Sequence, residues 1–257
     1  MIRLQKLLAE AGLGSRRTVE GWIREGRITV AGRTAALGDR ASATDDVRLD
    51  GRKLDLGSTP PESPELLLYY KPLGEVTTRS DPQGRPTVFE CLPTPRRGRW
   101  ISVGRLDVNT SGLLLLTTDG ELAHRLMHPS SEIEREYLVR LRGRPGPATL
   151  RRLLDGVELE DGPARFDRVS PAEDEGAPGP AGSHCAFRVV LHEGRNREVR
   201  RLWNAVGYEV SRLLRIRYGP IVLPRDMGPG AHRQADAALI ARLAEGVRRA
   251  APSQPAG

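Results

Sequence analysis

The sequence predicts an α+β protein with two parts: a small N-terminal module of helices and short strands, and a larger domain built on a mixed, largely antiparallel sheet. Three observations support this class. Two helical periods open the chain and short strand patterns follow them. Further along, apolar strands alternate with loops rich in Gly and Pro. Regularly alternating strand and helix units, which are typical of parallel α/β folds, are absent.

The N-terminal module is predicted to contain two amphipathic helices. In residues 2–11, the apolar residues recur at helical spacing and define one face. Ser15 is a favourable N-cap for the second helix, which is expected to end at Gly26. A short strand at 28–30 and a tight Asp-Gly hairpin at 47–54 complete the module.

Breaks in composition divide the chain. Residues 57–65 hold three prolines and no apolar period, which indicates a linker. We therefore expect one domain over 1–56 and a second over 66–249. Residues 174–183 are predicted to form a surface loop, and residues 250–257 a disordered tail.

The larger domain combines short strands with a few helices. Strand character is clear in residues 66–70, 100–103, 113–117, 137–141 and 186–191. Helices are expected at 121–127, 148–155, 197–206 and 235–249.

Positive charge gathers in two segments. The chain has 40 Lys and Arg against 33 Asp and Glu, a net charge of +7. Residues 1–33 contain seven basic and three acidic residues, and residues 194–217 contain seven and two. The remainder is slightly acidic, so this distribution predicts a polyanionic partner such as RNA. A GC-rich coding sequence explains the excess of Arg over Lys, but it does not explain the clustering.

Several classes of protein are excluded by missing signatures. Cys91 and Cys185 lie far apart, and the five His residues lack metal-ligand spacing, so we expect no metal site. The Gly-rich motifs of nucleotide-binding enzymes and the Gly-x-Ser-x-Gly motif of serine hydrolases are absent. Neither a membrane span nor a signal peptide is indicated, and we expect a cytoplasmic monomer without a cofactor.

Asp107 is the principal candidate for chemistry. It lies in the loop 104–112, between two predicted strands, where rigid flanking strands commonly hold catalytic groups. The residues alone allow two interpretations: a nucleophile or acid–base group, or an Asp that merely forms an Asx-turn with its polar neighbours.

The helix predicted after Asn196 offers a second candidate. Taking Val199 as the centre of its apolar face, Arg200 lies on the flank, from which a guanidinium can reach a cleft. Arg197 and Arg201 are expected to point away from that face, toward phosphate. The alternative is that all three are solvated arginines with buried stems.

Longer strings carry a family resemblance. Residues 3–33 resemble the S4 RNA-binding domain. The string GRLDVNTSGLLLLTTDG at 104–120 resembles the catalytic motif of the RsuA-type pseudouridine synthases, in which the Asp of GRLD is essential. Residues 71–89 and 135–137 match further motifs of this family. Residues 193–221 resemble its RluB-like branch, which modifies large-subunit ribosomal RNA.

The resemblance implies a reaction and a set of roles. It implies isomerisation of uridine to pseudouridine in 23S ribosomal RNA, by base flipping and without a cofactor or metal. Asp107 would act on the ribose, as a nucleophile or as a base. Arg200 would form an ion pair that orients Asp107, and Tyr137 would stack on the uracil.

RNA-binding roles and two alternatives also follow from the resemblance. Phosphate contacts in the S4-like module are expected from Lys6, Arg16, Arg17, Arg24 and Arg27. In the larger domain, Arg105 would fill the space left by the flipped base, and the residues near the loop bases would be Arg195, Arg197 and Arg201. The alternatives are a 16S ribosomal RNA synthase and a non-catalytic S4-type assembly factor.

Overall fold

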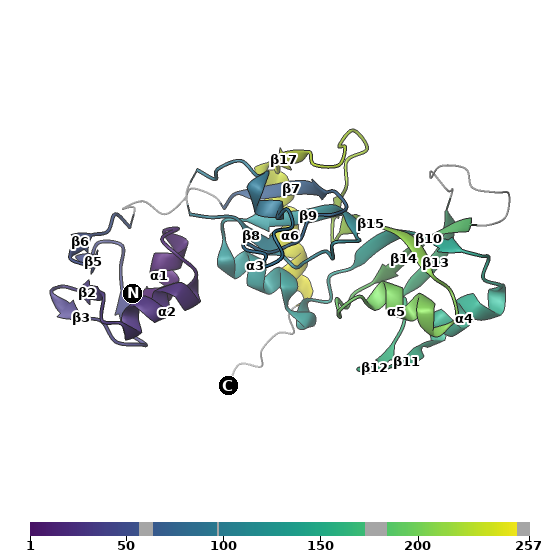
Figure 1. The fold of residues 1–257 in the computed structure, drawn as a ribbon, viewed down its shortest axis with the longest axis horizontal. Helices are drawn as coiled ribbons and strands as arrows, with labels where there is room; N and C mark the ends of the chain where they lie inside the picture. Colours follow the sequence, from purple (N-terminus) through teal and green to yellow (C-terminus); the bar gives the residue numbers. More distant parts are fainter. Residues whose placement is uncertain (57–63, 97, 173–183, 251–257) are drawn as a thin grey trace. The chain divides into compact units, whose positions relative to one another are not determined.

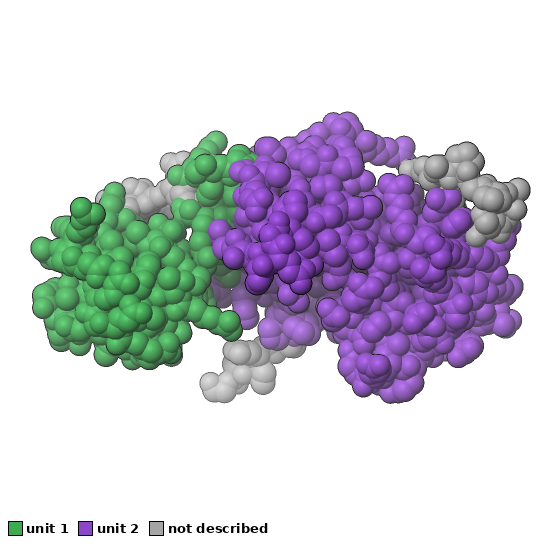
Figure 2. Space-filling model, viewed as in Figure 1, with its two compact units in different colours: residues 1–65, 93–101, 117–120 green, residues 66–92, 102–116, 121–257 purple. Residues whose placement is uncertain are grey.

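The computed structural model describes residues 1–56, 64–96, 98–172 and 184–250. They form two compact units (Figures 1 and 2). Unit 1 contains residues 1–65, 93–101 and 117–120, and unit 2 contains the rest of the chain. Most of the predicted linker, the predicted loop at 174–183 and the tail after residue 250 lie outside the described residues.

Unit 1 begins with the predicted helix pair. Its elements are β1 (Ile2–Arg3), α1 (Leu4–Glu10), α2 (Arg16–Arg24), β2 (Ile28–Val30), β3 (Arg33–Thr34), β4 (Arg40–Ala41), β5 (Val47–Leu49) and β6 (Arg52–Lys53). The hydroxyl of Ser15 accepts a hydrogen bond from the amide of Thr18 at 3.0 Å, which confirms the predicted N-cap. Asp50 and Gly51 both have positive φ, as the tight hairpin requires. Leu4, Leu8, Val19 and Ile28 are among the fully buried residues of the core.

Unit 2 holds most of the secondary structure. Its first half comprises β7 (Leu66–Lys71), η1 (Val88–Glu90), β8 (Ile101–Val103), β9 (Ser111–Thr117), α3 (Gly120–Met127), η2 (Pro129–Ser131), β10 (Arg135–Arg142) and α4 (Pro147–Asp155). One end residue each of β8, β9 and α3 is assigned to unit 1. The second half comprises β11 (Val157–Leu159), β12 (Gly162–Ala164), β13 (Arg168–Ala172), β14 (His184–Leu191), α5 (Glu198–Ala205), β15 (Val210–Tyr218), β16 (Ile221–Val222), β17 (His232–Gln234) and α6 (Ala237–Ala250).

One mixed sheet organises unit 2. The strand order is β13-β14-β10-β15-β9-β7-β17, with β8 on β9 and β16 on β15 (Figure 1). The pairing of β9 with β15 is parallel, whereas the pairings of β10, β13 and β14 are antiparallel. The predicted α+β class with a mixed, mostly antiparallel sheet is confirmed. Among the described residues, no helix has the length and apolar character that crossing a membrane requires.

Strand β15 was absent from the sequence-based expectations, although it joins the two halves of the sheet. Its sequence, VSRLLRIRY, places three Arg residues in a strand, and two register shifts against β10 disturb its apolar alternation. Beside the sheet, Trp203 of α5 is fully buried among Phe166, Phe187 and Tyr208. This aromatic packing fixes α5 and the turn that precedes it.

Candidate active site

A pocket of about 1040 Å³ lies in unit 2, where the loop after β8 meets β10, β15 and the segment before α5. Asp107, Tyr137 and Arg197 all line it. The loop 104–110, β10 and the segment 192–199 are far apart in sequence, and the sheet order brings them together. The pocket is therefore lined by two of the three predicted catalytic residues, together with three residues predicted to bind RNA: Arg105, Arg195 and Arg197.

The loop that carries Asp107 is held through its main chain. Each of the five consecutive carbonyl groups of residues 106–110 accepts a hydrogen bond. In order, the donors are Thr77 Oγ1, the amide of Thr110, the amide of Gly74, Arg200 Nη2 and Lys71 Nζ, at 2.9, 3.0, 2.9, 2.7 and 2.9 Å. The bond from Thr110 to Asp107 closes the turn within the main chain. The Asp107 carboxylate does not close it, so the Asx-turn interpretation does not describe this loop.

Lys71 holds the C-terminal end of the loop from within the sheet. Its side chain is fully buried, and Nζ donates to the carbonyls of Thr110 and Pro72 at 2.9 Å each. Burial lowers the pKa of Lys71 to about 8, while the negative charges of Glu75 and Asp107 oppose that shift. Lys71 lies within the segment 71–89 that resembles a motif of the family, but no signal in the sequence indicates its contact with this loop.

The carboxylate of Asp107 remains accessible in the pocket. Its side chain is 35% exposed, and Oδ2 lies 3.8 Å from Nη1 of Arg197. Arg197 has φ 50° and ψ 30°, which is the left-handed region that residues other than Gly rarely adopt. This backbone conformation turns the side chain toward the pocket. Strain of this kind concentrates at functional sites.

The position of Arg197 corrects two sequence-based expectations. The helix begins at Glu198, and Arg197 is its non-helical N-cap. Arg197 therefore does not follow the helical spacing that predicts a side chain pointing away from the apolar face. The second expectation was an ion pair between Arg200 and Asp107. In the structure, Arg197 is the arginine that lies beside the Asp107 carboxylate.

Arg200 contacts the loop instead of the carboxylate. It donates from Nη2 to the carbonyl of Asn109 at 2.7 Å and from Nη1 to the carbonyl of Val210 at 2.8 Å. Burial and the charge of Arg197 lower the pKa of Arg200, whereas Asp107 acts in the opposite direction. The guanidinium thus joins the loop of Asp107 to the start of β15.

Tyr137 lies on β10, directly opposite Arg215 of β15 and Val189 of β14. It is 9% exposed and lines the pocket. A ring in this position presents an aromatic surface to a ligand in the pocket.

The other predicted RNA-binding residues of unit 2 differ in their surroundings. Arg105 is exposed at the pocket, as expected. Arg195 lines the pocket and is bound to Glu193 at 2.5 Å and to the carbonyl of Gly162 at 3.2 Å. Arg201 forms a two-pronged ion pair with Asp161, at 2.8 Å for each bond. Its guanidinium is therefore engaged within the fold.

The predicted RNA-binding residues of unit 1 lie on its surface. Lys6 and Arg16 line a cleft of about 480 Å³ that also includes Arg3 and Arg40. Arg17 and Arg24 are exposed, and Arg24 lies 3.9 Å from Glu20. Arg27 is held by both carboxylate oxygens of Asp50 and by Glu25, which raise the pKa of its guanidinium.

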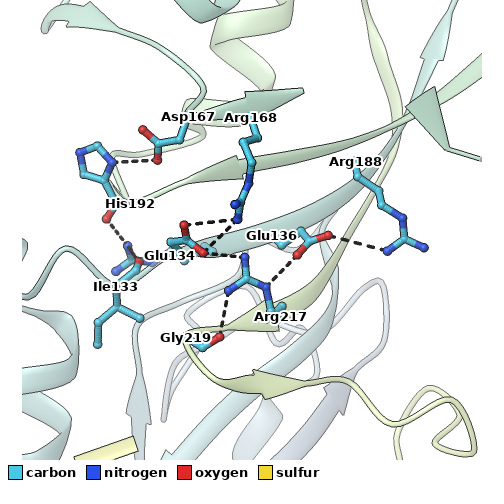
Figure 3. Close-up of polar contacts among 10 residues, drawn as sticks. Ile133, Glu134, Glu136, Asp167, Arg168, Arg188, His192, Arg217 and Gly219 are labelled. Atoms are coloured by element: carbon cyan, nitrogen blue, oxygen red, sulfur yellow. Dashed lines mark hydrogen bonds and ion pairs between the residues drawn. The ribbon is translucent and has the colours of Figure 1, made fainter. Parts of the chain in front are cut away.

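Ion pairs tie together the strands beside the pocket (Figure 3). Arg217 donates to Glu136 at 2.7 Å and to Glu134 at 2.9 Å, which links β15 to the segment that contains β10. Arg168 of β13 reaches Glu134 at 3.2 Å, and Arg188 of β14 lies 3.7 Å from Glu136. Four neighbouring strands are thereby joined through two carboxylates.

Arg135 holds the turn that forms one wall of the pocket. Its Nη1 donates to the carbonyls of Ile133, His192 and Glu193. His192 is fixed further by a 2.8 Å contact between Nδ1 and Asp167, which Figure 3 also shows.

Among the described residues, no group of three or more His, Cys, Asp and Glu side chains is arranged to bind a metal ion.

Two family models match separate parts of the chain. A family model described as RNA pseudouridylate synthase matches residues 65–205, and a model of the S4 domain matches residues 2–47. A protein of Pseudomonas aeruginosa named ribosomal large subunit pseudouridine synthase B is 51% identical over 245 residues, and the alignment covers 95% of this chain and 62% of that protein. The protein of the same name from Shigella flexneri is 53% identical, with 95% of this chain and 82% of that protein covered.

A solved structure described as a crystal structure of pseudouridylate synthase has a similar fold. Its TM-score is 0.64 at 27% sequence identity, and the match covers 95% of this chain and all of that one. The family match includes the loop of Asp107, strand β10 and all of α5.

Proposed function

The chain belongs to the RNA pseudouridylate synthase family, and we propose that it isomerises a uridine of large-subunit ribosomal RNA to pseudouridine in the pocket around Asp107. The observation that carries the assignment of the site is the accessible Asp107 carboxylate, which lies 3.8 Å from Arg197 in a pocket that Tyr137 also lines. The substrate class rests on the two relatives named as large-subunit synthases.

The reaction needs one carboxylate and no net transfer of atoms. The N1–C1′ bond of uridine breaks, the uracil turns, and C5 bonds to C1′. The proton lost from C5 is balanced by the one gained at N1, so substrate and product have the same composition. Asp107 serves either as a nucleophile at C1′ or as a base on the ribose while uracil leaves. Carboxylates form covalent intermediates at sugar carbons in glycosidases.

The neighbours of Asp107 position it in two ways. Arg197 attracts the carboxylate directly and limits its orientation. Arg200 acts through the main chain, because its bond to the Asn109 carbonyl fixes the loop two residues beyond Asp107. We therefore assign Arg200 as a positioning residue.

Tyr137 provides a surface for the detached base. Once the glycosidic bond breaks, uracil has no covalent tether, and stacking on an aromatic ring keeps it near C1′. The uridine must leave its base stack to enter the pocket, so base flipping is part of the proposal. The exposed Arg105, which also lines the pocket, is available to fill the space that the base leaves.

Unit 1 supplies affinity that does not depend on the bound sequence. The cleft lined by Lys6 and Arg16 collects positive charge suited to phosphate. We infer a cytoplasmic location, because ribosomal RNA is the substrate.

Pseudouridine mapping tests the proposal. Unmodified large-subunit and small-subunit ribosomal RNA transcripts are incubated with the wild-type chain and with Asp107→Asn, which preserves the size of the side chain. We expect one modified position in the large-subunit transcript for the wild type and none for the variant. Identical maps for the two proteins, or modification confined to the small-subunit transcript, would contradict the proposal.

A further inference from the structure

Arg215, on β15, is a buried cation with an unused hydrogen-bond donor. It is 2% exposed, and its Nε donates to the carbonyl of Leu113 at 2.7 Å. Among the described residues, no hydrogen-bond partner contacts its Nη2. Nη2 carries two of the five N–H donors of the guanidinium, and leaving them buried without an acceptor is energetically costly. Such a group in a pocket needs an explanation.

Arg215 belongs to the lining of the same pocket. It lines the pocket with Asp107 and Tyr137, and it is directly opposite Tyr137 in the register of β10 and β15. Side chains opposite each other on adjacent antiparallel strands share one face, with Cβ atoms about 5 Å apart. The ring of Tyr218, 5.2 Å from Cζ of Arg215, supports the guanidinium from another direction.

The backbone of Arg215 also fixes the start of β9. Gly112 pairs with Arg215 in the parallel register, and a Cβ at Gly112 would lie 2.7 Å from the amide nitrogen of Arg215. Because only glycine permits this approach, the loop that carries Asp107 and the strand that carries Arg215 are set closely against each other.

We propose that Arg215 recognises the target base by donating from Nη2 to O4 of the uracil that stacks on Tyr137. The inference rests on the proposed function and adds a specificity-determining residue to it. The missing partner must be a hydrogen-bond acceptor, and it must fit beside an aromatic ring within the sheet. A nucleobase carbonyl meets both conditions. A phosphate group would instead bind the exposed Arg105 and Arg197, which also line the pocket.

The choice of O4 follows from the chemistry of the bases. Uracil and cytosine share O2, but cytosine carries an amino group in place of O4. With cytosine, the amino group and the guanidinium would face each other as two hydrogen-bond donors. The buried N–H would then stay unpaired, which would disfavour cytosine. When the uracil turns to present C5 to C1′, its two carbonyls exchange places. The same N–H then meets O2 of the product, so the base has a polar contact with Arg215 before and after the turn.

The test replaces single atoms on both sides of the proposed bond. A synthetic stem-loop RNA carries the mapped target as uridine, 4-thiouridine or 2-thiouridine, since sulfur accepts hydrogen bonds poorly. Its single-turnover conversion is measured with the wild-type chain, Arg215→Met and Arg212→Met. Arg212 is an exposed arginine on the same strand and controls for loss of charge.

We expect 4-thiouridine to slow the wild type and Arg212→Met about tenfold, the equivalent of one hydrogen bond. Arg215→Met should lose a similar factor with uridine and should no longer distinguish uridine from 4-thiouridine. Arg215→Lys, which keeps a donor, should regain part of that distinction, and it serves as the test if Arg215→Met does not fold.

An equal penalty for 4-thiouridine in the wild type and in the folded Arg215 variant would overturn the inference, as would a loss of sensitivity to 2-thiouridine alone. In either case Nη2 would be satisfied by something other than O4. A wild-type chain that forms no pseudouridine in any RNA would instead contradict the proposed function itself.

Discussion

The two basic segments of the chain have similar charge and opposite surroundings. In residues 1–33, Arg16 and Arg17 are exposed on the surface of unit 1. In residues 194–217, Arg200 and Arg215 donate to main-chain carbonyls inside unit 2. A count of charges predicts phosphate contacts for both segments. The comparison shows that arginine has two uses here: Arg16 and Arg17 present their charge to solvent, whereas Arg200 and Arg215 hold the backbone of the site.

Removing an internal arginine should give the largest effect on the rate. We expect Arg200→Met to lower kcat about a hundredfold with little change in KM, because the loop is free to shift and a displacement of about 1 Å costs roughly that factor. Steady-state assays over a range of RNA concentrations measure kcat and KM. Arg212→Met, on the exposed part of β15, is the matched control, and a loss confined to KM in Arg200→Met would erase the distinction between the segments.

The buried Lys71 sharpens the comparison through pH. Because burial lowers the pKa of Lys71 from its ordinary value of 10.5 to about 8 in the folded state, the unfolded chain binds more protons between these values. Stability from this group therefore rises with pH in that window and is lowest below pH 8. Relative to Lys71→Met, the wild type should gain about 2 kcal/mol in free energy of unfolding between pH 7.5 and 9.5.

Urea denaturation at the two pH values measures this difference. Lys6→Met removes a lysine of unit 1 and serves as the control. A difference between the wild type and Lys71→Met that does not change with pH would show that Lys71 keeps an ordinary proton affinity in the folded protein.

Removing surface arginines of unit 1 should act on affinity alone. We expect the double variant Arg16→Gln, Arg17→Gln to bind RNA about tenfold more weakly at moderate salt and to keep the wild-type kcat. The slope of log affinity against log salt should fall by about 2, one for each lost phosphate contact. Binding titrations over a range of salt concentrations test this, and an unchanged slope would remove these two residues from the RNA interface.

Arg201 should give the smallest effect, although the sequence grouped it with the RNA-binding residues. Its guanidinium is occupied by Asp161 at 2.8 Å for each bond. We expect Arg201→Gln to change RNA affinity by no more than about twofold, since exposed ion pairs contribute little. A tenfold loss in the same titration would mean that Arg201 exchanges Asp161 for phosphate.

Local signals in the sequence were sufficient for most elements of the fold. Ser15 and the Asp50-Gly51 turn act through neighbouring residues, and their structures agree with the predictions. Strand β15 was missed because the arginines that disturb its pattern make contacts set by distant strands. Long-range partners of this kind leave no periodic trace in one sequence.

The candidate site shows the same limit. Asp107 and Tyr137 were found through motif resemblance, and the fold brings them to one pocket. The partner of Asp107 was misassigned because Arg197 leaves the helical region, a backbone choice that helical spacing does not reveal. The contact of Lys71 with Thr110 joins residues 39 positions apart, and no local pattern indicates it.

The five bonded carbonyls of residues 106–110 determine where motion occurs during the reaction. Folding has already removed the freedom of this loop, so docking of a nucleotide does not have to order it. The large rearrangements then belong to the nucleic acid: the unstacking of a nucleoside and the turning of its ring. The site of the protein is preorganised. Differences in the rate of modification among target sites should therefore follow the ease with which each RNA unstacks its target nucleoside.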